Sequence, residues 1–206
     1  MKLKQKIILE ALRLFSLKGF LTTSVLDITT AAGCSKGGFY NHFKSKEELF
    51  LAVLAKAREI WRTHNLGGLE ETQSPVAKVK KLLFNFRDIY LKDTDCLPGG
   101  CIFTTLSVEL DDQLPELAKE ISRGFGGLKD MIKSLLEQAK QSGELSEHTD
   151  TDAAAALIFA GVLGVTVIYG VDKSSETLDL TIASLCDYLD RLSPNGPKAT
   201  PRTPPA

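Results

Sequence analysis

Apolar residues recur three and four positions apart along almost the whole chain, which is the period of an α-helix that buries one face. The first such stripe precedes a helix stop at Gly19 and contains Ile7, Ile8, Ala11, Leu12 and Phe15. No segment alternates between apolar and polar residues as a half-buried strand would. The pattern therefore predicts an all-α protein of about nine helices.

Capping residues divide the N-terminal part into short helices. Ser24 and Asp27 have the spacing of a capping box, so a second helix is predicted to begin after Ser24 and to end at Gly33. Ser35 can cap a third short helix, which we expect to continue to Phe43.

A long helix is predicted after a second capping box, Ser45 with Glu48, and the same apolar spacing continues through the helices that follow. The later helices are predicted from Pro75 through Ile89, over 101–112, from Pro115 to Gly143, and over 152–170 and 175–192. The helix that begins at Pro75 is expected to bury Val79, Leu82, Leu83, Phe86 and Ile89.

Charge is distributed unevenly, although the net charge of the whole chain is only −1. Residues 1–63 carry 11 Lys and Arg against 5 Asp and Glu, a net of +6, whereas residues 64–206 carry 14 against 21, a net of −7. A basic part on an acidic body is typical of a nucleic-acid partner, and an unrelated unevenness of surface charge is the alternative.

Residues 33–46, GCSKGGFYNHFKSK, concentrate glycines, lysines and aromatic residues. A phosphate-binding loop would need Lys and Ser or Thr where Phe39 and Tyr40 stand, and a strand before it. Nucleophilic catalysis would need an oriented base, but no acidic residue shares the helix face of His42. No residues have the spacing of metal ligands. We therefore expect no catalytic residue, no metal and no cofactor.

The same residues fit a helix-turn-helix, whose second helix enters the major groove of DNA. Gly33 supplies the turn between the two helices. Gly37 and Gly38 cost the second helix about 1 kcal/mol each relative to Ala, which is tolerable if they let the backbone approach DNA; a frayed helix start is the alternative. Lys36 and Lys46 can neutralise phosphates, and Lys46 does so at a helix N-terminus.

The segment from Thr22 to Phe50, TTSVLDITTAAGCSKGGFYNHFKSKEELF, resembles the DNA-binding motif of the TetR family of bacterial transcriptional regulators. The A-A-G-x-S-K-G turn, the F-Y-x-H-F helix and the K-x-E-L-F entry occur in the family's order and spacing. The resemblance implies a homodimer that binds double-stranded DNA at a near-palindromic operator and takes up a small-molecule effector. By matching position it implies DNA contacts from Ser24, Ser35, Lys36, Gly37, Tyr40, Asn41, His42 and Lys46.

The resemblance also divides the chain into domains. It implies a helix-turn-helix DNA-binding domain over residues 1–46 and a helical effector-binding and dimerisation domain over 47–192, whose first helix connects the two. Five of the eight prolines fall in 194–206, so the tail 193–206 is expected to be disordered. No secretory signal is recognised, which favours a cytoplasmic protein. The apolar run 153–171 approaches membrane-spanning length, but its Ala and Gly content favours helix packing, and no membrane partner is expected.

The last two helices are expected to form the dimer interface, as the resemblance implies, because they supply more small and apolar surface than a monomer should expose. The alternative is that they complete the core of one chain. The residues expected at the interface are Gly161, Gly164, Leu178, Ile182, Leu185 and Leu189.

The middle helices are expected to enclose a mostly apolar effector pocket, and a fully packed core made by the same residues is the alternative. The expected lining consists of Phe86, Tyr90, Cys101, Phe103, Leu106, Phe125 and Leu128. The pair Gly100-Cys101 resembles a branch of the family that responds to reactive or unsaturated compounds, although Cys101 could equally be a small packing residue.

The sequence thus predicts a DNA-binding transcriptional regulator, a repressor released from its operator by a small-molecule effector. A cysteine-dependent helical enzyme or redox protein that uses Cys101 is the alternative from another class, and a module that binds only proteins is a third. Neither alternative explains a net charge of +6 on residues 1–63.

Overall fold

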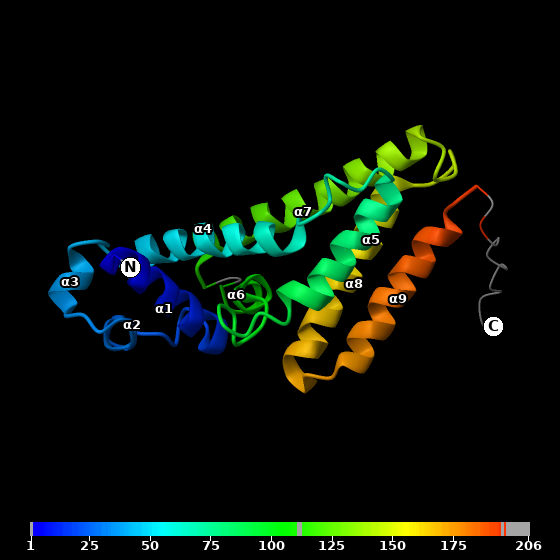
Figure 1. Cartoon of the computed structure of the whole chain (residues 1–206). Coiled ribbons are helices and arrows are strands. Elements are labelled where there is room, and N and C mark those ends of the chain that lie inside the picture. The colour runs from blue at the N-terminus through cyan, green and yellow to red at the C-terminus, as the bar shows by residue number, and fades with distance from the viewer. Residues whose placement is uncertain (1, 111–112, 195, 197–206) are drawn as a thin grey trace.

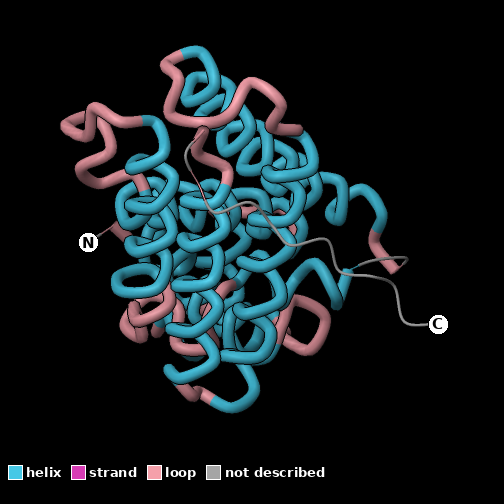
Figure 2. The backbone as a smooth tube through the Cα atoms, turned by 90° about the vertical axis from the view of Figure 1, so that its right-hand side faces the viewer, coloured by secondary structure: helices cyan, strands magenta, loops and turns pink. Residues whose placement is uncertain are grey.

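The computed structural model describes residues 2–110, 113–194 and 196, which form nine α-helices and one π-helical turn without a β-strand (Figure 2). The all-α prediction is confirmed for this part of the chain. The N-terminal helices are α1 (Leu3–Lys18), α2 (Val25–Ala32), α3 (Lys36–Tyr40) and α4 (Lys46–Asn65). The later elements are α5 (Pro75–Asn85), η1 (Phe86–Tyr90), α6 (Ile102–Leu110), α7 (Pro115–Gln141), α8 (Thr151–Asp172) and α9 (Ser175–Arg191). The tail predicted to be disordered, 193–206, lies largely outside the described residues.

The helices are arranged along one long axis (Figure 1). Helices α1, α2 and α3 lie at one end, and α5, α8 and α9 lie side by side at the other. Helix α6 lies between these two groups and packs against α1 as well as against α7 and α8. We call residues 2–46 the head and the residues from 47 onward the body.

The predicted capping box begins α2. The Ser24 hydroxyl accepts the N–H of Asp27, and the Asp27 carboxylate accepts the N–H of Ser24 at 2.8 Å. The Lys18 ammonium lies 3.1 Å from the same carboxylate. The hydrogen bonds from Ser24, with that from Lys18, lower the pKa of Asp27 to about 2.

Two details of the N-terminal helices differ from the sequence prediction. Helix α3 ends at Tyr40 instead of Phe43, and a turn carries the chain onward. Ser45 caps α4 by accepting the N–H of Glu48, but the Glu48 carboxylate accepts the N–H of Lys44 at 2.7 Å and not that of the capping residue. Only half of the second capping box therefore forms.

The π-helical turn η1 changes the register of the helix that begins at Pro75. A π turn holds an additional residue, so the side chains after it are rotated relative to those before it. Ile89 is consequently 45% exposed, whereas Tyr90 is only 1% exposed. The prediction that Ile89 faces the core is wrong for this reason.

Helices α8 and α9 pack against each other within one chain. A Cβ atom on Gly161 would lie 3.1 Å from the Leu185 side chain, so these two residues mark a close contact of α8 with α9. Four residues assigned from sequence to a dimer interface are 0% to 7% exposed and belong to the core of a single chain: Leu178, Ile182, Leu185 and Leu189. This corrects the assignment, because the most apolar stripe of α9 turns inward.

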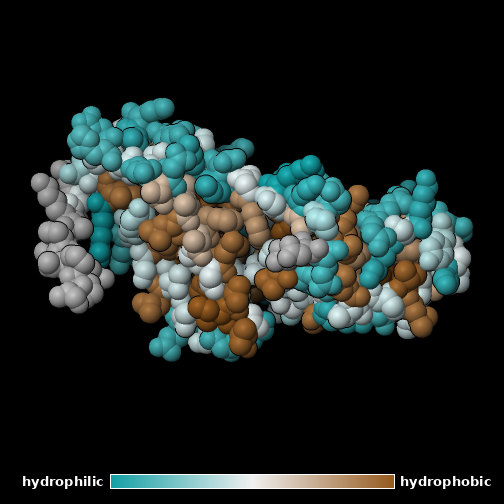
Figure 3. All heavy atoms as spheres, turned by 180° about the vertical axis from the view of Figure 1, so that it is seen from behind, coloured by the Kyte–Doolittle hydropathy of each residue, from teal (hydrophilic) through white to brown (hydrophobic). Residues whose placement is uncertain are grey.

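A second apolar stripe stays exposed on α8, which is apolar on all its faces. Four large apolar residues of α8 and one of α9 are 45% to 84% exposed. They are Leu157, Val167, Ile168 and Val171 on α8, and Leu180 on α9. Gly164 lies exposed within the same stripe, and Figure 3 shows apolar side chains gathered on this side of the body. By length and composition, α8 is also the one helix among those described that could cross a membrane.

Candidate nucleic-acid interface and effector cavity

The head contains two short helices joined by a tight turn. Gly33 ends α2 in the left-handed conformation, with φ +61°, which glycine adopts without steric cost. The Cys34 N–H donates to the carbonyl of Thr29 at 2.9 Å, so the end of α2 is satisfied by the turn itself. Ser35 then caps α3 by accepting the N–H of Gly38 at 3.1 Å.

Helix α3 presents one buried face and one exposed face. Phe39 and Phe43 are 0% and 2% exposed, and their ring centroids lie 5.8 Å apart in the core of the head. The residues on the other side that were predicted to contact DNA are exposed: Ser35, Lys36, Gly37, Tyr40 and Asn41. His42 is half-buried at the edge of this surface. The turn therefore leaves polar and small side chains of α3 free for a partner.

Among the residues that the structure describes, nothing requires position 37 to be glycine. It lies in a helix, and a Cβ atom there would meet only the Ser35 hydroxyl oxygen, at an ordinary distance of 3.8 Å. Alanine would raise helix propensity at this position. A close approach of something outside the chain is the remaining physical reason for a residue without a side chain.

Ser24 and Lys46 have partners inside the head. The Ser24 hydroxyl donates to Asp27 at 2.8 Å, and the Lys46 ammonium donates to the carbonyls of Phe20 at 2.8 Å and Thr23 at 2.9 Å. The same ammonium lies 4.2 Å from the centroid of the Phe20 ring. Lys46 therefore ties the start of α4 to the loop before α2, with one of its three donors left over.

Glu109, in the last turn of α6, connects the body to the head through hydrogen bonds. Its carboxylate accepts the N–H groups of Phe20 at 2.6 Å and Leu21 at 2.8 Å. Gly19 permits this approach, because its φ is +81° and a Cβ atom there would collide with the carboxylate. The role of Glu109 could not be predicted from the sequence, since only the packing of α6 against α1 brings it to this loop.

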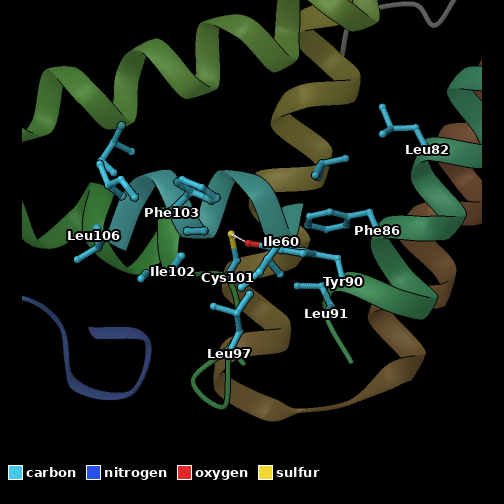
Figure 4. Close-up of a cluster of buried hydrophobic side chains, with 14 of the residues drawn as sticks. Ile60, Leu82, Phe86, Tyr90, Leu91, Leu97, Cys101, Ile102, Phe103 and Leu106 are labelled. Carbon is cyan, nitrogen blue, oxygen red and sulfur yellow. Dashed lines mark hydrogen bonds between the residues drawn. The ribbon is translucent and has the colours of Figure 1, made fainter. Parts of the chain in front are cut away.

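A cavity of about 450 Å³ lies in the body between α4, η1, α6, α7 and α8. Five of the seven residues predicted to line a pocket do line it: Phe86, Cys101, Phe103, Phe125 and Leu128. Tyr90 and Leu106 are not part of its wall, because they are 1% and 0% exposed and packed in the core (Figure 4). Tyr90 instead donates its O–H to the Cys101 sulfur at 3.5 Å.

Polar residues at one end of this cavity were not predicted. Arg58 and Arg62 come from α4, and Glu120 and Arg123 come from α7. They recur at helical spacing with apolar lining residues, such as Trp61, so each belongs to the face of its helix that meets the cavity. This signal was present in the sequence but could be interpreted only once the two helices were known to face each other.

The surroundings of Cys96 disfavour redox chemistry at that residue. Burial raises the pKa of the Cys96 thiol, and the nearby Asp93 raises it further. A high thiol pKa disfavours the thiolate that redox chemistry requires. No group of three His, Cys, Asp or Glu side chains in the described part of the chain is placed to hold a metal ion.

Comparison with known proteins decides the family. Residues 7–53 match the model of the bacterial regulatory proteins of the tetR family, and residues 75–185 match the tetracyclin repressor-like C-terminal domain. The chain belongs to the TetR family. This TetR-family chain is 30% identical over 178 residues to an uncharacterized HTH-type transcriptional regulator in the lacX 3′ region of Lactococcus lactis subsp. lactis, covering 85% of this chain and 87% of that protein.

Two further relatives agree along nearly the whole chain. The HTH-type transcriptional repressor DhaR of Mycobacterium sp. (strain GP1) is 28% identical over 85% of this chain and 86% of its own length. The crystal structure of a TetR transcriptional regulator from Chloroflexus aurantiacus J-10-FL superposes with a TM-score of 0.84 at 28% identity, covering 91% of this chain and 93% of that one. The TetR-family assignment therefore applies to the head and to the body.

Proposed function

We propose that this TetR-family protein is a cytoplasmic, homodimeric repressor that binds a near-palindromic DNA operator and leaves it when a small molecule occupies the body cavity. The exposed face of α3 carries this proposal, because it combines Lys36, Tyr40 and Asn41 with a glycine that no contact of the described residues requires. Relatives named as transcriptional regulators and repressors support it.

Within this function, we assign the residues of the head to two roles. Ser35, Lys36, Gly37, Tyr40, Asn41 and His42 contact DNA. Ser24 and Lys46 hold the frame of the motif, because their polar groups already have partners in the head. A phosphate contact from Lys46 would use its one remaining donor.

The effector acts through α6 in this proposal. Phe103 and Thr104, near the start of α6, line the cavity, and Glu109, near its end, accepts two N–H groups of the head. An effector shifts DNA binding only if it has different affinities for the two positions of such an element. Binding is non-covalent in this account, and Cys101→Ser should leave the response to a neutral or anionic effector intact.

The dimer is proposed to form through the exposed stripe of α8 and the adjoining residue of α9. This surface exposes five large apolar residues, and a soluble protein usually covers apolar surface of this kind with a partner: Leu157, Val167, Ile168, Val171 and Leu180. Dimerisation through it would bury the stripe.

Footprinting on the DNA that flanks the protein's own gene tests the function. We expect a protected segment, and Lys36→Gln should weaken it and flatten the log–log salt dependence of binding by about one unit. Lys119→Gln, which changes an exposed lysine of the body, should do neither. Absence of any protected segment with folded protein would contradict DNA binding at this locus.

A further inference from the structure

The polar end of the body cavity carries an excess of positive charge. Arg58, Arg62 and Arg123 face it together with a single carboxylate, that of Glu120, which gives a net charge of +2. Arg58 donates to the carbonyl of Glu120 at 2.8 Å and to its carboxylate at 3.3 Å, and Arg123 donates to the other carboxylate oxygen. One carboxylate is therefore shared between two guanidinium groups.

Arg62 does not share the Glu120 carboxylate with Arg58 and Arg123. Within the described residues, no carboxylate lies within 4.0 Å of its guanidinium group, and the side chain is exposed at the cavity. A guanidinium group has five N–H donors and pairs well with a planar carboxylate. The body as a whole is acidic, with 17 Lys and Arg against 24 Asp and Glu in residues 47–206. This positive end is thus a local feature and does not follow from the general charge of the body.

Apart from the hydroxyl groups of Thr104 and Thr166, the rest of the cavity wall is apolar. Aromatic, aliphatic and thioether side chains from η1, α4, α6, α7 and α8 surround the space: Trp61, Phe86, Phe103, Phe125, Met131 and Val162. Gly124 and Gly127 of α7 also face it, and no atom of the described residues lies within 4 Å of where a Cβ would stand at either position. These glycines keep the cavity open where side chains would fit.

We propose that the effector of this protein is an amphipathic carboxylate, an apolar chain or ring system that ends in one carboxylate. Its apolar part lies among the aromatic side chains, and its carboxylate pairs with Arg62 and with the donors of Arg123 and Arg58 that Glu120 leaves free. This inference rests on the proposed role of the body as a sensor, and it names the chemical class of the molecule that is sensed.

Trp61 provides a direct measurement, because it is the single tryptophan of the chain and lines the cavity. Decanoate, 1-decanol and decyl phosphate are titrated separately into the full-length protein while Trp61 fluorescence is followed. We expect decanoate to bind at least about tenfold more tightly than 1-decanol, the difference that one charge-assisted hydrogen bond makes. Equal or tighter binding of the alcohol, or of decyl phosphate, would overturn the carboxylate assignment.

Three variants with opposite expectations sharpen the test. Arg62→Gln should weaken decanoate binding about tenfold and leave 1-decanol unchanged. Glu120→Gln should strengthen decanoate binding, because it frees Arg58 and Arg123. Arg191→Gln, which changes an exposed arginine outside the cavity, should change nothing. Equal loss of both ligands in Arg62→Gln, or weaker decanoate binding in a folded Glu120→Gln, would refute the proposal.

Gly124→Leu establishes where the probe binds. A Cβ at this position meets no atom of the described residues within 4 Å, and the leucine side chain should occupy the cavity and abolish the fluorescence change for decanoate and 1-decanol. An unchanged response would place the ligand elsewhere and overturn the inference. The DNA footprint is measured in parallel without ligand. If the protein gives a footprint but does not prefer decanoate over 1-decanol, only the proposed ligand class is refuted. If it prefers decanoate but gives no footprint, only the proposed function is refuted.

Discussion

At the residue scale, the head combines residues that serve folding with residues that do not. Phe39 is fully buried, and Ser35 satisfies an N–H group at the start of α3. Gly37 does neither, and its position in a helix lowers stability relative to alanine. A residue such as Gly37, which lowers stability and makes no compensating contact among the described residues, is expected on a surface that binds a partner.

Gly37→Ala should therefore raise stability and weaken DNA binding together. We expect the free energy of unfolding to increase by up to about 1 kcal/mol, because alanine has the higher helix propensity. Urea unfolding measures this change, and fluorescence anisotropy with the footprinted DNA measures affinity. Gly126→Ala on α7, where a Cβ also meets no atom within 4 Å, should stabilise without affecting DNA. Unchanged DNA affinity in Gly37→Ala would contradict the proposal that the backbone at Gly37 lies close to DNA.

Asp27 makes the stability of the head depend on pH. Its folded pKa of about 2 lies below its ordinary value of 3.8, so its stabilising contribution is complete above about pH 4 and is lost as the pH falls toward 2. Asp27→Asn should be less stable than the wild type at neutral pH, and the difference should shrink between pH 4 and pH 2. Thermal unfolding across this range checks the sign, and a difference that does not vary with pH would exclude the proposed role of the carboxylate.

At the element scale, α6 connects the cavity with the head. Its first turn contributes Phe103 to the cavity wall, and its last turn places Glu109 on two N–H groups of the loop after α1. Ahead of α6, the Gly99 N–H lies 3.4 Å from the Ser16 hydroxyl of α1. A displacement of α6 by a ligand would therefore reach the head at both ends of this helix.

Glu109→Gln should weaken the coupling between the two sites more than it weakens either site. The neutral amide loses the charge-assisted acceptor and keeps the shape of the side chain. We expect the factor by which cavity ligand lowers DNA affinity to fall several-fold, and DNA should lower ligand affinity by the same reduced factor. Glu116→Gln, an exposed carboxylate of α7, is the control. Full coupling in Glu109→Gln would move the connection to another element.

Among these elements, the helix starts could be predicted from the sequence, whereas the contacts between distant helices could not. Helix starts at Ser24, Ser35 and Ser45 were predictable, because a cap depends on residues three positions away. The exposure of Ile89 was not, since the π turn before it results from packing in the body. The contact of Glu109 with the head likewise depends on two helices far apart in the sequence.

At the scale of the whole molecule, the proposed dimer requires an apolar surface that is not already used in the core of one chain. Sequence patterns cannot distinguish an apolar stripe that faces the core from one that faces a second chain. Leu185 and Val167 are both apolar residues of amphipathic or apolar helices, yet the first is 7% exposed and the second 50%. The lining of the cavity could not be predicted from the sequence either, because Arg58 and Arg62 line it only where α4 lies opposite α7.

Gly164→Arg should convert the dimer to a folded monomer. In the part of the chain that the structure describes, no atom lies within 4 Å of a Cβ at Gly164, so an arginine there should be compatible with the fold. A tightly packed apolar interface, by contrast, cannot bury its charge. Gly126→Arg makes the same change at an exposed glycine of α7 with equal space and should leave the dimer intact. Light scattering distinguishes the states, and a dimer that survives Gly164→Arg would place the interface elsewhere.

Selection of bound sequences from random double-stranded DNA tests the central claim most directly. Two α3 helices related by a two-fold axis and about 34–36 Å apart should recover an inverted repeat whose half-sites are separated by one turn of DNA. In this account, Asn41→Ala selects a different base in both half-sites at once, because the same residue reads each of them. Recovery of a sequence without symmetry, or no enrichment by folded protein, would contradict the claim that this chain is a dimeric, sequence-specific regulator.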